Sequence, residues 1–176
     1  MRLCVFCGSA SGHLGVYAQA ASELGRLMAQ QDITLVYGGG NIGLMGTVAD
    51  SVLAHGGKAI GVIPHFLAAR EVAHQNLTEL IMTDSMHERK RRMADLADAF
   101  IAMPGGWGTL EELAEILTWR QLGLIPSPVA VLNTQGFFDP LLAQMQHMVT
   151  SGFLAEAHWR KLIVESHPAA VLARLA

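Results

Sequence analysis

One arginine stands where its side chain could do chemistry. Arg89 lies in the segment 86–97, whose apolar residues recur at helical spacing, and this spacing places Arg89 or Lys90 between them, so that a charge is aimed along the buried face. Such an arginine either extends past the core to solvent or has an anionic partner. Its fork of N–H donors suits a phosphate or a carboxylate. Arg91 falls away from the apolar stripe, and we expect it to be solvated.

The second candidate is Glu112, which follows the glycine-rich turn 104–109. Thr109 and Glu112 have the spacing of a capping box, in which Thr109 caps a helix and Glu112 reaches back, so a structural role would suffice. The same spacing places the carboxylate one helical turn from backbone N–H groups that could hold a phosphate. There the carboxylate could orient water or stabilise a cationic ribosyl centre. Both interpretations stay open.

Glycine-rich turns indicate a phosphate ligand, and the turns 7–12, 37–43 and 103–109 are of this kind, while the turn 83–85 is acidic. Glycine lets backbone N–H groups approach an anion. Gly38, Gly40 and Gly43 match the dinucleotide fingerprint, but the region 58–64 holds no acidic residue for the ribose, which disfavours NAD. A nucleoside triphosphatase is also disfavoured, because no glycine precedes Lys-Ser or Lys-Thr.

Metal and cofactor chemistry have little support in the sequence. The eight histidines are scattered, and the lysines Lys58, Lys90 and Lys161 follow no pyridoxal-phosphate pattern, so we expect no metal and no cofactor. Cys4 and Cys7 have the spacing of a redox pair. They lie within a predicted strand, where positions three apart point to opposite faces, so we expect no disulfide.

Composition predicts a globular chain that associates with itself. Of its 176 residues 51% are hydrophobic and only 15% are charged, which favours a single domain (1–176) with an apolar interface, as in a homodimer. The formal net charge of -3 and the single dense basic run 89–92 argue against a nucleic-acid partner. The apolar stretch 3–7 is too short for a signal peptide, and no stretch could span a membrane. We therefore expect a cytoplasmic location without a membrane partner.

Short apolar runs alternate with segments of helical period, which predicts an α/β fold with a Rossmann-like, doubly wound parallel sheet. The expected strands are 3–7, 33–37, 58–63, 77–82, 99–103, 129–132 and 162–164. The expected helices are 16–30, 44–55, 86–97, 110–122 and 138–150. Ligands bind such sheets at the carboxyl ends of the strands, which is where the glycine-rich turns fall.

The motif Pro104-Gly105-Gly106-x-Gly108-Thr109-x-x-Glu112, with Met86-His87-Glu88-Arg89-Lys90 upstream, resembles the LOG (Lonely Guy) family of cytokinin riboside 5′-monophosphate phosphoribohydrolases. The likeness extends to the turns 7–9 and 37–46 and covers the chain through about Leu122. It implies a homodimeric Rossmann-like enzyme without metal or redox cofactor. Its substrate would be a nucleoside monophosphate, an N6-modified AMP and often AMP, cleaved to the free base and ribose 5-phosphate.

The resemblance also implies the site residues. The essential arginine and glutamate of the family fall on Arg89 and Glu112. Trp107 occupies a variable position of the motif, and Ala10 stands where many relatives have serine. The substrate contacts implied are Gly8, Ser9, Gly39, Gly40, Glu71, Lys90, Gly105, Gly106, Trp107, Gly108, Thr109, Leu110, Glu111 and Thr118.

Two other functions compete with this one. Molybdenum-cofactor carriers resemble this fold and share a similar glycine-rich loop, and a carrier would bind nucleotide without consuming it. In a carrier Glu112 would be expendable. Lysine decarboxylase is a label often attached to the family, but the absence of a plausible pyridoxal-phosphate pattern argues against it.

Overall fold

The computed structural model describes residues 1–68 and 73–175, and its centre is one parallel sheet. Within these residues seven strands lie in the order β4-β3-β2-β1-β5-β6-β7, and every neighbouring pair is parallel. This confirms the predicted fold class. The strands are β1 (Arg2–Phe6), β2 (Thr34–Tyr37), β3 (Ala59–Pro64), β4 (Glu79–Thr83), β5 (Ala99–Ala102), β6 (Val129–Leu132) and β7 (Ile163–Glu165).

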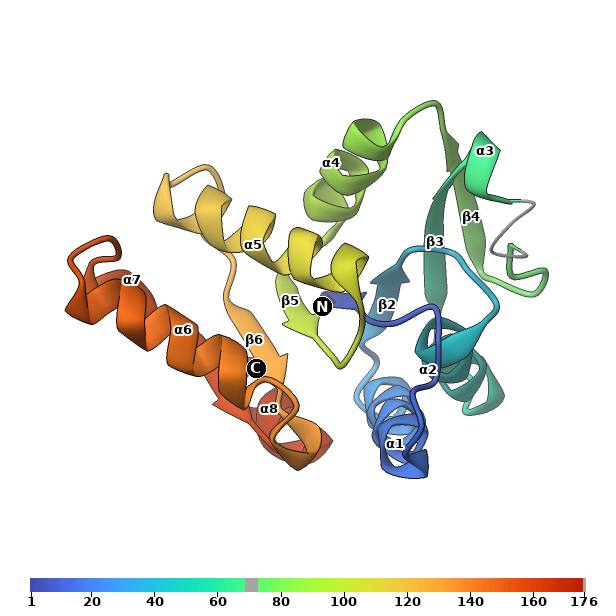
Figure 1. The fold of residues 1–176 in the computed structure, drawn as a ribbon. Coiled ribbons are helices and arrows are strands. Elements are labelled where there is room, and N and C mark those ends of the chain that lie inside the picture. Colours follow the sequence, from blue (N-terminus) through green and yellow to red (C-terminus); the bar gives the residue numbers. More distant parts are fainter. Residues whose placement is uncertain (69–72, 176) are drawn as a thin grey trace.

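Helices cover both faces of the sheet (Figure 1). One hydrophobic cluster joins the sheet to α1, α2 and α8, and a second joins the opposite face to α4, α5 and α6. The helices are α1 (Gly15–Gln30), α2 (Gly43–Ala54), α3 (His65–Ala68), α4 (Met86–Leu96), α5 (Trp107–Gln121), α6 (Asp139–Thr150), α7 (Glu156–Trp159) and α8 (Pro168–Leu175), with a 3-10 turn η1 at Thr134–Gly136.

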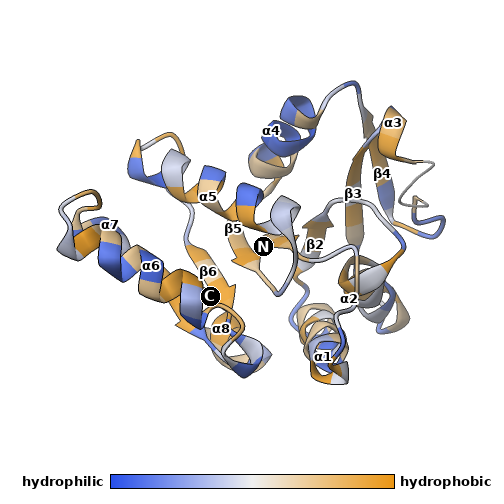
Figure 2. Cartoon of the chain, in the orientation of Figure 1, coloured by the Kyte–Doolittle hydropathy of each residue, from blue (hydrophilic) through white to orange (hydrophobic). Residues whose placement is uncertain are grey.

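The central strands are apolar throughout because both of their faces are covered. Every residue of β5 and β6 is buried, and Figure 2 shows the sheet as hydrophobic with polar residues on the helices that cover it. Cys4 packs in the cluster with α4 and α5, whereas Cys7 packs in the cluster with α1 and α2. The two thiols are therefore on opposite faces, as the strand periodicity predicted, and both are free.

The main error of the prediction concerns the start of α5, which begins at Trp107 rather than at 110. Its N-cap is Gly106, so Thr109 lies inside the first turn and not at the N-cap position that the capping-box interpretation of Thr109 and Glu112 requires. The physical reason is that Thr109 packs in the first turn against Gly105, where a Cβ would collide with the threonine hydroxyl.

A capping arrangement forms on α4 instead. The hydroxyl of Ser85, the N-cap, accepts a hydrogen bond from the backbone N–H of Glu88 at 3.1 Å. The carboxylate of Glu88 accepts one from the N–H of Asp84 at 2.8 Å. This exchange fixes the first turn of the helix that carries Arg89.

The helices α3, α7 and α8 were not predicted. The first two are single turns of four residues, too short to show a hydrophobic period. Across the ranges that the structure describes, no helix combines the length and the apolar character that crossing a membrane requires.

Candidate active site

A cavity of about 160 Å³ opens at the carboxyl ends of β1 and β5. The chain continues from β1 to a helix on one face of the sheet and from β5 to a helix on the other, so the crevice between them is a topological switch point. The cavity is lined by Val5, Phe6, Cys7, Gly8, Ser9, Gly38, Met45, Arg89, Met93, Gly106, Trp107, Gly108, Thr109 and Glu112.

Two backbone turns meet beneath this cavity at close range. The N–H of Gly8 donates to the carbonyl of Pro104 at 3.1 Å. A Cβ on Gly8 would lie 3.3 Å from the Cα of Gly105, so neither turn has room for a side chain at this crossing. The first N–H groups of α2, from Leu44 and Met45, donate to the carbonyl of Gly8 at 3.0 and 3.3 Å. The N–H groups of Leu44 and Met45 at the amino end of α2 therefore hold the turn after β1 in place.

The amino end of α5 faces the cavity. The first intrahelical bond runs from the N–H of Leu110 to the carbonyl of Gly106, so the helix itself supplies no acceptor for the N–H groups of Trp107, Gly108 and Thr109. No acidic residue lies in this first turn. Unpaired helical N–H groups and the positive end of the helix dipole together form an anion site.

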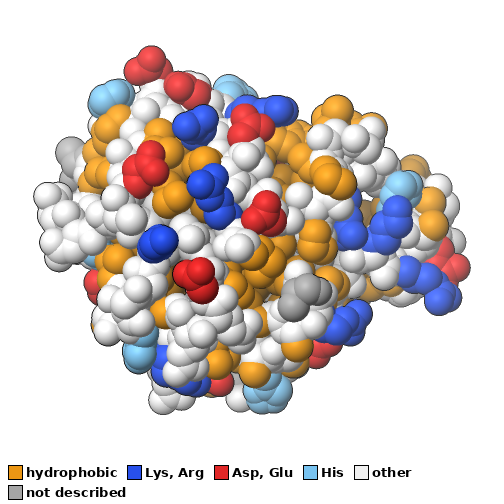
Figure 3. Space-filling view, turned by 180° about the vertical axis from the view of Figure 1, so that it is seen from behind, with side chains coloured by type: hydrophobic (Ala, Val, Ile, Leu, Met, Phe, Trp, Pro, Cys, Tyr) orange, Lys and Arg blue, Asp and Glu red, His pale blue; other side chains and the backbone are white. Residues whose placement is uncertain are grey.

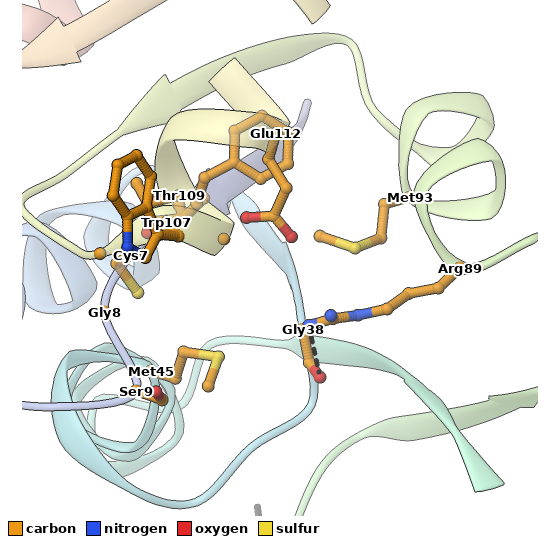
Figure 4. A pocket seen from close by; sticks show the side chains of 14 residues that line it. Cys7, Gly8, Ser9, Gly38, Met45, Arg89, Met93, Trp107, Thr109 and Glu112 are labelled. Atoms are coloured by element: carbon orange, nitrogen blue, oxygen red, sulfur yellow. Dashed lines mark hydrogen bonds between the residues drawn. The ribbon is translucent and has the colours of Figure 1, made fainter. Parts of the chain in front are cut away.

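Arg89 reaches the cavity from α4 and is only 5% exposed. Its Nε donates to the carbonyl of Val62 at 3.1 Å and its Nη2 to the carbonyl of Gly38 at 3.3 Å, as Figure 4 shows for the latter. Gly38 is required here because a Cβ at this position would collide with Nη2. The guanidinium neither extends to solvent nor moves freely. Two backbone carbonyls hold it at the wall of the cavity.

Glu112 enters the same cavity from the second turn of α5 (Figure 4). It is 9% exposed, and its carboxylate points toward the space between α4 and α5. Burial, and after it the nearby Glu112 carboxylate, raises the pKa of the Cys7 thiol well above its usual range. The cavity thus combines a fixed cation, a carboxylate and the amino end of a helix.

Lys90 and Glu111 flank the cavity but are absent from its lining among the described residues. The Nζ of Lys90 lies 2.5 Å from Glu111 and 3.1 Å from Glu115, both on α5. Burial alone would lower the pKa of Lys90, but the hydrogen bonds to Glu111 and Glu115 outweigh it, and the pKa is raised. Lys90 is therefore a charged group held between two carboxylates.

A second cavity of about 230 Å³ adjoins the first and shares Gly8, Ser9 and Gly106 with it. Gly105 and Ala10 line this second cavity. The structure therefore brings the predicted Gly8, Ser9, Gly105, Gly106, Trp107, Gly108, Thr109, Arg89 and Glu112 together in two connected hollows.

Other predicted contacts lie elsewhere. Gly39 and Gly40 belong to the turn after β2, where the carbonyl of Gly39 accepts from the N–H of His74 and Gly40 bridges to Ala73. Thr118 and Leu110 line an apolar groove formed by α5, α6 and α7, and Leu110 also lines a hollow with Gly105, Gly106, Trp107 and Thr109. Glu71 lies outside the described residues.

Six lining residues were missing from the predicted site: Val5, Phe6, Cys7, Gly38, Met45 and Met93. Met93 belongs to the apolar stripe of α4, where helical spacing alone explains a buried methionine. Figure 4 shows the thioethers of Met93 and Met45 entering the cavity from different sides, Met93 near Glu112 and Met45 near Ser9. Polarizable, unbranched side chains of this kind fit ligands of irregular shape.

The chain was compared with known proteins. The profile of the family described as "Possible lysine decarboxylase" matches residues 45–175. The cytokinin riboside 5′-monophosphate phosphoribohydrolase LOG of Oryza sativa subsp. japonica is 51% identical over 162 residues, which are 92% of this chain and 67% of the rice protein. This chain belongs to the LOG family. An Arabidopsis thaliana LOG protein with the same activity in its name is 45% identical over 99% of this chain and 81% of its own length.

Solved structures show the same fold at low identity. The molybdenum cofactor binding protein of Rippkaea orientalis superposes with a TM-score of 0.72 at 22% identity, covering 98% of this chain and 93% of that protein. The molybdenum-cofactor carrier of Chlamydomonas reinhardtii gives the same values. This likeness is one of fold. The identity to the plant LOG proteins is about twice as high.

Proposed function

We propose that this LOG-family chain hydrolyses the N-glycosidic bond of adenosine 5′-monophosphates, N6-modified ones included, and releases the free base and ribose 5-phosphate. The observation that carries the proposal is the convergence of Arg89 and Glu112 on one cavity at the amino end of α5. The names of the two plant relatives that are 45% and 51% identical over the aligned residues state this activity.

The 5′-phosphate binds at the first turn of α5. The N–H groups of Trp107, Gly108 and Thr109 donate to its oxygens, and the glycine at 106 leaves the approach open, since a Cβ there would meet nothing within 4 Å. Ser9, on the facing turn, lies within both hollows and adds a hydroxyl. The phosphate thereby fixes where the ribose lies relative to Glu112.

Glu112 acts on the ribose. It lies one helical turn beyond the phosphate-binding residues, so its carboxylate faces the sugar of a nucleotide whose phosphate is held at the helix end. As the base departs, C1′ gains oxocarbenium character, and the carboxylate stabilises this charge or activates the attacking water.

Arg89 acts on the leaving base. Its guanidinium is immobilised by Val62 and Gly38, so it presents a fixed positive charge and further N–H donors to the cavity. A departing purine accumulates negative charge, and a preorganised cation stabilises it without reorganisation during the reaction. Arg89 and Glu112 thus stand on two sides of the bond that breaks.

The test is to incubate the protein with AMP and with isopentenyladenosine monophosphate and to separate the products chromatographically. The wild type should release free base and ribose 5-phosphate. Glu112→Gln, which keeps the volume of the side chain, should lower turnover about 10²- to 10⁴-fold with an unchanged thermal midpoint. Nucleotide bound by the wild type and recovered intact would instead indicate a carrier.

The chain also offers a surface for a homodimer. Among the described residues α6 has no buried side chain, and it borders an apolar groove of about 430 Å³ formed with α5 and α7. Phe153, Leu122 and Leu124 near this groove are 88%, 66% and 62% exposed. On the face of the molecule seen in Figure 3, charged side chains of both signs lie among the apolar ones. We propose that a second copy covers the groove.

We propose a cytoplasmic location because of the substrate. A nucleoside monophosphate carries charges that do not cross a bilayer without a carrier, so it is found where it is synthesised. Cell fractionation that recovers the protein with the membrane or outside the cell would contradict this location.

A further inference from the structure

Three charged side chains join α4 to α5 beside the cavity. Lys90, on α4, contacts Glu111 at 2.5 Å and Glu115 at 3.1 Å, one turn further along α5. Only 9% of the lysine side chain is exposed, against 54% for Glu111 and 27% for Glu115. The lysine side chain is mostly covered, and removing either the ammonium or the two carboxylates leaves charge without its partner.

These residues are the sequence neighbours of the reacting pair. Lys90 follows Arg89 directly, and Glu111 precedes Glu112. Successive residues of a helix point about 100° apart, so Arg89 and Glu112 face the cavity while their neighbours meet on its flank. Neither Lys90 nor Glu115 lines the cavity in the part of the chain described.

We propose that Lys90 is a positioning residue, whose ion pairs with Glu111 and Glu115 set the spacing of α4 and α5 and hence of the Arg89 guanidinium and the Glu112 carboxylate. The proposal rests on the proposed function. Arg89 is carried by α4 and Glu112 by α5, so the two groups belong to different helices. The Lys90 cluster is a direct polar link between these helices.

This role differs from the substrate contact that the family resemblance implies for Lys90. A lysine that binds the phosphate directly contributes to affinity, so its loss should raise KM, and freeing it from Glu111 and Glu115 should strengthen binding. A positioning lysine needs its carboxylate partners. The two roles therefore predict opposite results when Glu111 and Glu115 are neutralised.

The experiment compares Lys90→Met, Lys90→Arg, the double variant Glu111→Gln/Glu115→Gln and the triple variant that combines it with Lys90→Met, all with AMP as substrate. We expect Lys90→Met to lower kcat about 10- to 100-fold, since small displacements of reacting groups have effects of this size, with little change in KM. The double variant should match it, and the triple should fall no further. Lys90→Arg should restore most of the activity. A merely structural role would lower the thermal midpoint and leave kcat per folded molecule unchanged.

The proposal is overturned if Lys90→Met raises KM at unchanged kcat, or if the double variant keeps wild-type kcat. Amide hydrogen exchange without nucleotide gives a readout that is independent of catalysis. Exchange in α4 and in the first turns of α5 should accelerate in Lys90→Met and in the double variant but not in Lys90→Arg. Unchanged exchange refutes the link even if the wild type proves inactive, whereas an inactive wild type with the expected exchange pattern refutes only the proposed function.

Discussion

At the scale of single residues, Gly38 and Arg89 form a matched pair. The glycine carbonyl accepts from Nη2, and the missing side chain leaves the space that this nitrogen occupies. The glycine therefore serves the geometry of the arginine more than the flexibility of its own turn. A fingerprint-like glycine pattern in the sequence concealed this role, because the pattern is explained equally well by a tight turn.

We expect Gly38→Ala to displace the Arg89 guanidinium, because the added methyl group would occupy the space of Nη2. This displacement should lower kcat with AMP at least tenfold, as the loss of Arg89 itself would. Gly15→Ala is the control, since a Cβ at Gly15 meets nothing within 4 Å and Gly15 lies outside the cavity lining. Steady-state kinetics and thermal unfolding of both variants test this. Full activity of Gly38→Ala would show that the position of Arg89 is not critical.

The two thiols give a prediction about pH. Burial and the Glu112 carboxylate raise the pKa of Cys4 and Cys7, so both stay protonated where an unfolded thiol, with a pKa of about 8.5, ionises. Their contribution to stability is complete below that pH and is lost as the pH rises above it. Iodoacetamide at about pH 8.5 should label the urea-unfolded chain rapidly and the native protein slowly. Rapid labelling of the native protein would contradict this burial.

At the scale of the element, α4 depends on the capping exchange between Ser85 and Glu88. Ser85→Ala should lower the free energy of unfolding by about 1 kcal/mol, as measured by urea denaturation. Ser151→Ala is the control, because Ser151 is an exposed residue at the carboxyl end of α6. Equal stabilities of the two variants would mean that the cap contributes nothing.

The two helices of the site begin differently for a physical reason. At α4 the Ser85 hydroxyl accepts a hydrogen bond from the N–H of Glu88 in the first turn. At α5 a glycine is the N-cap, and the N–H groups are left for an anion. The absence of a capping side chain is thus itself a feature of the proposed phosphate site.

At the scale of the whole molecule, the proposed dimer can be tested at the groove between α5, α6 and α7. Phe153→Asp should convert a dimer into a monomer, because a carboxylate in an apolar interface loses its hydration without gaining a partner. Light scattering on a size-exclusion column should show the mass halved. Phe66→Asp is the control, since Phe66 on α3 is also exposed, at 56%. A wild type that is already monomeric would refute the proposed dimer.

The sequence by itself determined the parallel α/β fold, and it predicted that Arg89 and Glu112 belong to one site at the carboxyl ends of the strands, where the structure places both in the lining of one cavity. It could do so because continuous apolar runs, helical periods and glycine-rich turns are local signals, and because the motif around Arg89 and Glu112 is specific. Only the tertiary structure decided that α5 begins at Trp107, that Gly38 makes room for Arg89 and that Lys90 pairs with Glu111 and Glu115. These are contacts between residues far apart in the chain, and no local pattern specifies which distant side chain or backbone will occupy the space beside a given residue.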